Sequence, residues 1–151
     1  MALTQEVIAL FEVLVEEVGE QYATIHVSDI PTTPKPSLRV SLSPTNPGSA
    51  PIIILVSEGQ EVFLTLGHDC RYEMPITRKR QELEILRDVG AVSRAVMAGE
   101  FEEEVWFRGD DVVAAKGRLK VGDKIEKFWT SAFKPFLRGA KHEVFNYQPY
   151  K

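Results

Sequence analysis

A histidine, an aspartate and the only cysteine of the chain stand side by side at His68, Asp69 and Cys70. In an extended segment, side chains two residues apart project to one face, so His68 and Cys70 would lie together. Such a pair can form a thiolate–imidazolium couple or supply two metal ligands. No Cys-x-x-Cys or His-x-Glu pattern accompanies it, and the other histidines are distant in the sequence. The pattern favours the polar end of a hairpin strand, without a metal site, and metal binding or a reactive thiol is the alternative.

Three cations, Arg78, Lys79 and Arg80, stand at the start of a predicted helix, with Thr77 as its N-cap. Positive charge at this end opposes the helix dipole. The free backbone N–H groups and these side chains could together hold an anion, such as a phosphate or the carboxylates of a partner. The other explanation is that solvent and nearby glutamates neutralise the cations.

A run of acidic residues follows that helix. Glu102 and Glu104 share one face of a predicted strand with Trp106, and Asp110 and Asp111 follow at a predicted turn. The run lacks the Asp-x-Asp-x-Asp-Gly spacing of a calcium loop, and its carboxylates would lie on an exposed strand without a sugar cleft. Acidic residues around an aromatic anchor are typical of a docking surface, so we expect a basic partner protein here.

The charge of the chain is unevenly distributed. Residues 1–115 carry nine Lys or Arg against nineteen Asp or Glu, whereas residues 116–151 carry nine against three. Asp123 and Glu126 have capping-box spacing and predict a last helix that, because of Pro135, ends or kinks near Ser131 to Lys134. Its aromatic stripe favours packing on the core or in a homodimer over binding to nucleic acid. The aromatic residues of this stripe are Phe128, Trp129, Phe133 and Phe136.

Composition places the chain among ordinary globular proteins. Of its 151 residues, 44% are hydrophobic and 26% are charged, which fits one domain over residues 1–151. No apolar run approaches the roughly 20 residues that cross a bilayer. The acidic N-terminal segment has no basic leader, and a single cysteine cannot form an internal disulfide. We therefore expect a cytoplasmic protein.

These residues must be positioned by helices and strands that the periodicity predicts. A one-sided helix begins near Thr4 and ends near Gly19, and a second helix extends from Thr77 to Gly99. Alternating residues predict strands over 22–28 and 37–43, a hairpin over 52–66, and a hairpin that turns at residues 108–111. The order is α-β-β-β-β-α-β-β-α. Strands joined by short turns predict an α+β fold with two layers, a mostly antiparallel sheet covered by helices.

This order is similar in outline to small bacterial protein-binding folds, including secretion chaperones and toxin-neutralising immunity proteins. No motif supports the likeness, which concerns architecture alone. The sequence favours a non-enzymatic, cytoplasmic protein-binding domain without a cofactor. The alternative is a small enzyme or anion binder that uses His68, Cys70 and the cations Arg78 to Arg80.

Overall fold

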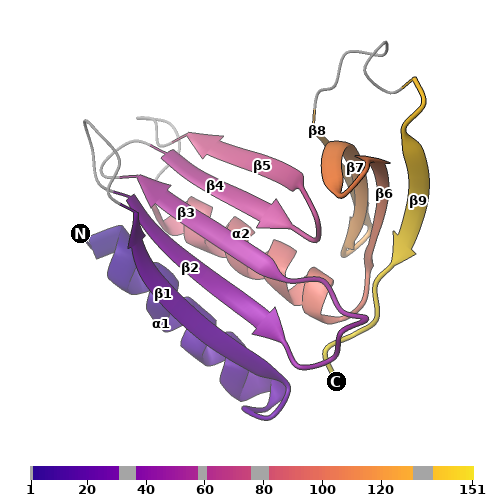
Figure 1. The fold of residues 1–151 in the computed structure, drawn as a ribbon. Helices are drawn as coiled ribbons and strands as arrows, with labels where there is room; N and C mark the ends of the chain where they lie inside the picture. Colours follow the sequence, from indigo (N-terminus) through magenta and orange to yellow (C-terminus); the bar gives the residue numbers. More distant parts are fainter. Residues whose placement is uncertain (1, 31–36, 58–60, 76–81, 131–137) are drawn as a thin grey trace.

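The computed structural model describes residues 2–30, 37–57, 61–75, 82–130 and 138–151. These residues form two helices and nine strands, arranged as two sheets (Figure 1). The helices are α1 (Ala2–Val18) and α2 (Glu82–Met97). The strands are β1 (Ala23–Ile30), β2 (Ser37–Pro44), β3 (Ile52–Ser57), β4 (Glu61–Leu66), β5 (Cys70–Pro75), β6 (Phe101–Arg108), β7 (Asp111–Val121), β8 (Lys124–Thr130) and β9 (Lys141–Asn146).

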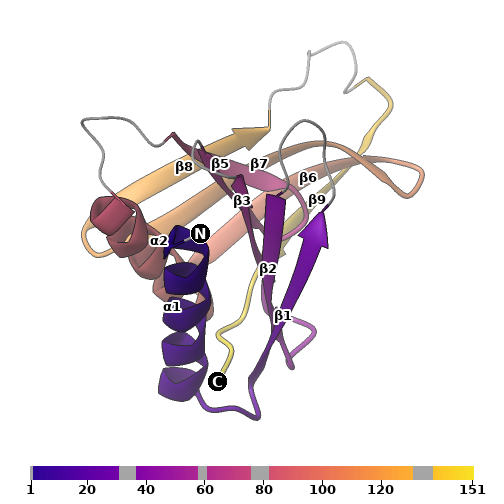
Figure 2. The same cartoon turned by 90° about the vertical axis from the view of Figure 1, so that its left-hand side faces the viewer.

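Strands β1 to β5 form the first sheet, in which each strand pairs antiparallel with the next one in the chain. Both helices lie on one side of this sheet, and the other side is not covered by either of them (Figure 2). The central side chains on the helix side are fully buried, among them Val40, Ile54 and Leu64. The nonpolar stripe of α1, which includes Val7 and Phe11, is buried as well. The alternating nonpolar residues of the strands and the nonpolar stripe of the helix therefore face one another in a common core.

The second sheet has the antiparallel order β8-β7-β6-β9. Its two consecutive hairpins turn through the two-residue loops Gly109-Asp110 and Gly122-Asp123. The glycines have φ values of 64° and 60°, and neither aspartate has positive φ. Glycine at the first loop position is typical of type II′ turns, whose twist matches that of the strands.

The two sheets share a hydrophobic core. Residues such as Phe101 and Leu119 from the second sheet belong to the same buried cluster as the side chains under α1. The segment after β9 returns to the first sheet, where the Tyr150 hydroxyl donates to the Ala50 carbonyl over 2.6 Å. The predicted class, an α+β fold with antiparallel sheets, is confirmed. Neither α1 nor α2 has the length and apolar character needed to cross a membrane.

The predicted last helix is wrong where the structure describes it, because residues 124–130 form strand β8. The segment fits both periods, and hydrogen bonding to β7 decides between them. Asp123 belongs to a hairpin loop and not to a capping box. Strands β5 and β9 were not predicted, so the observed order is α-β-β-β-β-β-α-β-β-β-β. Residues 131–137, including Phe133 and Phe136, lie outside the described residues.

Candidate functional site

Glu103 is a carboxylate in the core. Strand β6 alternates so that Phe101, Glu103 and Val105 are buried, and the exposed fraction of Glu103 is 0%. An ionised group removed from water is stable only when donors replace the water it loses. The position of Glu103 therefore requires a set of hydrogen-bond donors around it.

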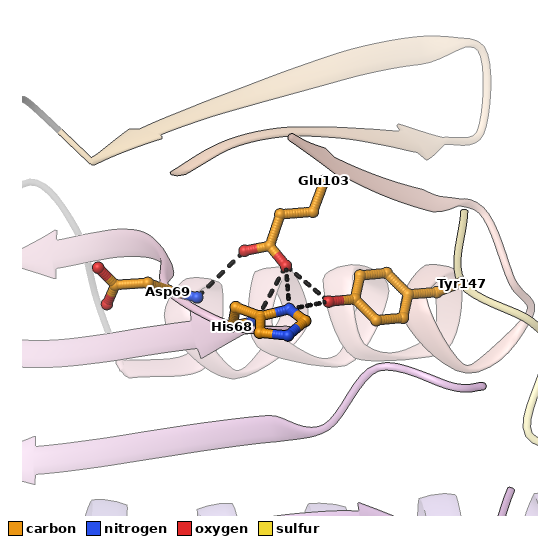
Figure 3. Close-up of polar contacts among 4 residues, drawn as sticks. All are labelled: His68, Asp69, Glu103 and Tyr147. Atoms are coloured by element: carbon orange, nitrogen blue, oxygen red, sulfur yellow. Dashed lines mark hydrogen bonds and ion pairs between the residues drawn. The ribbon is translucent and has the colours of Figure 1, made fainter. Parts of the chain in front are cut away.

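Those donors come from two distant segments (Figure 3). Oε1 of Glu103 accepts the backbone N–H of His68 at 2.9 Å and the Tyr147 hydroxyl at 2.6 Å. Oε2 accepts the backbone N–H of Asp69 at 3.1 Å. One carboxylate thus joins β6, the turn between β4 and β5, and the segment after β9. We name His68, Asp69, Glu103 and Tyr147 the Glu103 cluster.

The turn that supplies the two N–H groups depends on glycine. Gly67 has a φ of 63°, a backbone conformation that residues other than glycine rarely adopt. A Cβ atom at this position would lie 2.5 Å from Oε1 of Glu103 and 2.8 Å from the Tyr147 hydroxyl. Glycine lets successive N–H groups converge on the carboxylate, as in other backbone anion sites.

The His68 ring is held by the same cluster. Its Nδ1 lies 2.7 Å from the Tyr147 hydroxyl oxygen and 3.2 Å from Oε1 of Glu103. The Tyr147 hydroxyl donates its hydrogen bond to Glu103. Nδ1 of His68 must therefore be the donor in any hydrogen bond to the Tyr147 oxygen or to Oε1 of Glu103. The ring packs against Phe145 with centroids 4.3 Å apart, and 35% of the side chain is exposed. An imidazole oriented through Nδ1 can use Nε2 as a base or a ligand.

Cys70 is part of the same buried region, so the structure does bring His68 and Cys70 to one carboxylate. Burial, the negative charge of Glu103 and a hydrogen bond to it raise the pKa of the Cys70 thiol well above its ordinary value. The thiol is fully buried. A nucleophilic cysteine needs an accessible thiolate, which these surroundings disfavour. These surroundings therefore argue against the thiolate–imidazolium alternative.

The sequence carried one signal for this cluster. Glu103 has the same strand parity as Phe101 and Val105, so a strand with those residues inward must also bury Glu103. Nothing in the local pattern marked Tyr147 as its partner. Among the described residues, no group of three or more His, Cys, Asp or Glu side chains is placed to hold a metal ion.

The predicted docking residues lie on the opposite side of β6. Glu102, Glu104 and Trp106 are half-buried on the outer side of the second sheet, as their parity predicts. Strand β7 places Arg118 opposite Glu102 and Lys116 opposite Glu104. The basic end of the chain thus folds beside the acidic strand, and the surface carries mixed charge. We name this surface the outer face; its residues are Glu102, Glu104, Trp106, Lys116, Arg118, His142 and Val144.

Nonpolar groups also reach solvent on the outer face. Val144 lies opposite Glu104 and is 49% exposed. The Trp106 ring stacks on His142, with centroids 4.8 Å apart. Asp110 and Asp111 are exposed at the adjacent turn between β6 and β7. The five predicted docking residues therefore belong to a single hairpin, with Asp110 in its loop and Asp111 at the start of β7.

Two further predictions concerned an anion site and a homodimer surface. The proposed anion site at Arg78, Lys79 and Arg80 lies outside the described residues. Phe128 is only 3% exposed and packs edge-to-face on Phe101, so it belongs to the core of its own chain and is not available at a dimer surface. The remaining aromatic side chains of that segment are not described, and a homodimer stays a prediction.

Comparison with known proteins does not assign the chain to a group. No family model matches it, and neither a curated protein nor a solved structure matches it.

Proposed function

We propose that this chain is a non-enzymatic, cytoplasmic protein that binds a basic partner protein through the outer face. The observation that carries the proposal is the pairing of nonpolar and acidic groups there. Trp106 and Val144 lie beside Glu104 at a surface that neither described helix covers. An aromatic anchor with a charged surround is typical of the residues that dominate protein interfaces.

Charge defines the orientation of the partner. Glu102, Glu104, Asp110 and Asp111 follow one hairpin, and the cations Lys116 and Arg118 lie on the neighbouring strand. A basic partner gains most when its cations lie over β6 and the β6–β7 turn, away from β7. Electrostatic attraction would accelerate encounter, and desolvation of Trp106 would then slow dissociation.

The closed state of the Glu103 cluster favours binding over catalysis. Both oxygens of Glu103 already accept hydrogen bonds, and Cys70 is inaccessible. A group that must take part in a reaction needs space for a substrate beside it. The outer face, in contrast, presents its groups to solvent.

The proposal is tested by capturing the partner from a lysate of the source cells and measuring its affinity for purified variants. We expect Trp106→Ala to weaken binding by about 2 kcal/mol, or roughly 30-fold. The pair Glu102→Lys and Glu104→Lys should weaken it at least about tenfold at low salt. The matched control changes the exposed residues Glu12 and Glu16 of α1 to lysine, which alters net charge equally.

Two results would refute this function. One is an affinity that the Trp106 and Glu102/Glu104 variants leave unchanged. The other is weaker binding when Lys116 and Arg118 are both changed to glutamate, because a basic partner should bind this variant more tightly. That second result would point to an acidic partner or to one with mixed charge.

A second candidate is a small hydrolytic enzyme that uses His68 as its base. The observation in its favour is the orientation of the imidazole, whose Nδ1 lies against Glu103 and Tyr147, so that Nε2 is the ring nitrogen that could face a substrate. Hydrolysis of activated esters and phosphoesters should then be lost in His68→Asn and retained in Cys70→Ala. Hydrolysis by the unaltered protein no faster than by His68→Asn would exclude the candidate for these substrates.

A further inference from the structure

The side of the first sheet that neither described helix covers, called the uncovered side below, is unexpectedly nonpolar. An antiparallel sheet with one side in water alternates nonpolar and polar residues along each strand. Strand β3 departs from this rule: Ile52, Ile54 and Val56 are fully buried on the helix side, while Ile53 and Leu55 project to the other side. Phe63 of β4 lies opposite Leu55 on that same uncovered side. These outward nonpolar residues have no role in the core under the helices.

They form the floor of a shallow hollow of about 410 Å³. The hollow is lined by Ile30, Arg39, Ile53, Leu55, Phe63, Thr65, Asp69 and Arg71. Each of the central nonpolar side chains is only half-buried. We name this surface the sheet hollow.

Two arginines stand on opposite sides of the floor. Arg39 lies next to Leu55 on β2, and Arg71 lies next to Thr65 on β5. The Arg71 guanidinium is fixed by Asp69, whose Oδ1 accepts from Nε and Nη2 at 3.1 Å each, yet 66% of the Arg71 side chain remains exposed. Guanidinium groups in such positions are suited to carboxylates.

The spacing of the arginines selects the kind of ligand. Strands β2 and β5 are separated by three interstrand steps, or about 14 Å at about 4.8 Å for each step. A ligand with two separate carboxylates matches this spacing better than a ligand with one. An extended peptide covers about 3.3 Å for each residue, so acidic residues four or five positions apart would span it. A hollow open on one side also buries too little of a small molecule to be a typical ligand pocket.

We propose that the sheet hollow binds an extended segment of a partner protein, with nonpolar residues over Leu55 and Phe63 and a carboxylate at each arginine. The segment lies on the surface of the first sheet, away from the outer face of the second sheet. This site is independent of the proposed function: the acidic segment can belong to the same partner or to another protein.

The test is selection of binding peptides from a displayed library of random dodecapeptides. Enriched peptides should contain two acidic residues, four or five positions apart, with nonpolar residues between them. Fluorescence anisotropy of one labelled peptide should show at least a tenfold loss of affinity in Arg39→Glu/Arg71→Glu. Leu55→Ser should weaken binding by a similar factor. The control Arg87→Glu/Lys127→Glu, at two exposed positions, should retain the affinity, and all variants are first checked for unchanged thermal unfolding.

Several results would overturn the inference. They are enrichment of basic or charge-free peptides, no enrichment at all, and binding that the two arginine changes leave intact. Saturable binding of dodecanoate that competes with the peptide in the unaltered protein would identify an amphipathic carboxylate as the occupant instead. A dimer in solution that Leu55→Ser dissociates would identify a second copy of the chain. Loss of the outer-face function leaves the peptide result unaffected, so the two proposals fail separately.

Discussion

The two sides of strand β6 use the same amino acid for opposite purposes. Glu103 points inward, is fully buried and accepts hydrogen bonds from the β4–β5 turn and from Tyr147. Glu102 and Glu104, one residue away on either side, point outward and lie opposite cations of β7. The inward glutamate holds distant segments together, and the outward pair is half-exposed at the surface.

This difference teaches that strand parity, and not residue type, decides what a carboxylate does. A buried carboxylate that loses its donors costs several kcal/mol, because neither water nor another group replaces them. A half-exposed carboxylate paired across a strand contributes about 0.2 to 1 kcal/mol. Changes at the two sides should therefore differ strongly in their effect on stability.

The largest effect is expected from Glu103→Ala. This change leaves two backbone N–H groups and the Tyr147 hydroxyl without their acceptor and creates a void, so we expect a loss of about 3 to 5 kcal/mol in the free energy of unfolding. Urea unfolding followed by tryptophan fluorescence measures it. A loss below about 1 kcal/mol would mean that the cluster does not hold the segments together.

A comparison of two glycines isolates the contact at the carboxylate. Gly67 and Gly109 have almost equal φ values, 63° and 64°, but an added Cβ meets Glu103 only at Gly67, and nothing within 4 Å at Gly109. Gly109→Ala should cost about 1 kcal/mol from backbone strain, and Gly67→Ala about 2 kcal/mol more. Thermal unfolding of both variants provides the measurement. Equal costs would show that the turn does not need to approach Glu103 closely.

Alkaline pH should lower the free energy of unfolding because of two buried groups close to Glu103, Cys70 and Tyr147. The pKa of Cys70 and that of Tyr147 are raised in the folded state, mainly by burial and by Glu103. Above the ordinary thiol pKa of 9.0, the unfolded chain loses a proton that the folded chain keeps, so stability falls as pH rises.

Cys70→Ala removes one of these protons. It should flatten the decline in unfolding free energy between pH 9 and 10 by about 1 kcal/mol relative to the unaltered protein. Urea unfolding at pH 8, 9 and 10 gives the two slopes, and the slopes are compared because the variant also loses packing volume. Identical slopes would place the thiol in a more open environment than the structure does.

The smallest effect on stability is expected on the outward side. Glu102→Lys/Glu104→Lys should change the free energy of unfolding by less than about 1 kcal/mol, since exposed cross-strand pairs contribute little. The same protein should show the loss of partner affinity described above. A large loss of stability would show that the outer face is structural, and the proposed function would lose its support.

The sequence was sufficient for much of the fold because its periods were unambiguous. The stripe of α1 and the alternation of β2 can be satisfied by only one kind of element. The last predicted helix failed because residues 124–130 fit two periods, and only pairing with β7 selects the strand. The Gly-Asp loop before it repeats the loop of the β6–β7 hairpin, which was a usable local signal for a second hairpin.

The candidate site was less predictable for a different reason. Parity alone places Glu102, Glu104 and Trp106 outward, and it also places Glu103 inward. The partners of Glu103 depend on how the two sheets pack, because His68 and Tyr147 are 35 and 44 residues away in the chain. The hydrophobic periodicity of the sequence does not predict contacts between segments so far apart in the chain. The cations opposite Glu102 and Glu104 likewise follow from hairpin register and not from the local sequence.

The most direct test of the division between the two sides of β6 is urea unfolding of Glu103→Gln and Glu104→Gln, compared at neutral pH. Both changes keep side-chain shape and remove one negative charge. We predict a loss of about 3 kcal/mol in the free energy of unfolding for Glu103→Gln, and a change below about 0.5 kcal/mol for Glu104→Gln. Equal effects would contradict this division. A gain in stability for Glu103→Gln would contradict it more strongly, because it would mark Glu103 as a residue kept for function at a cost to the fold.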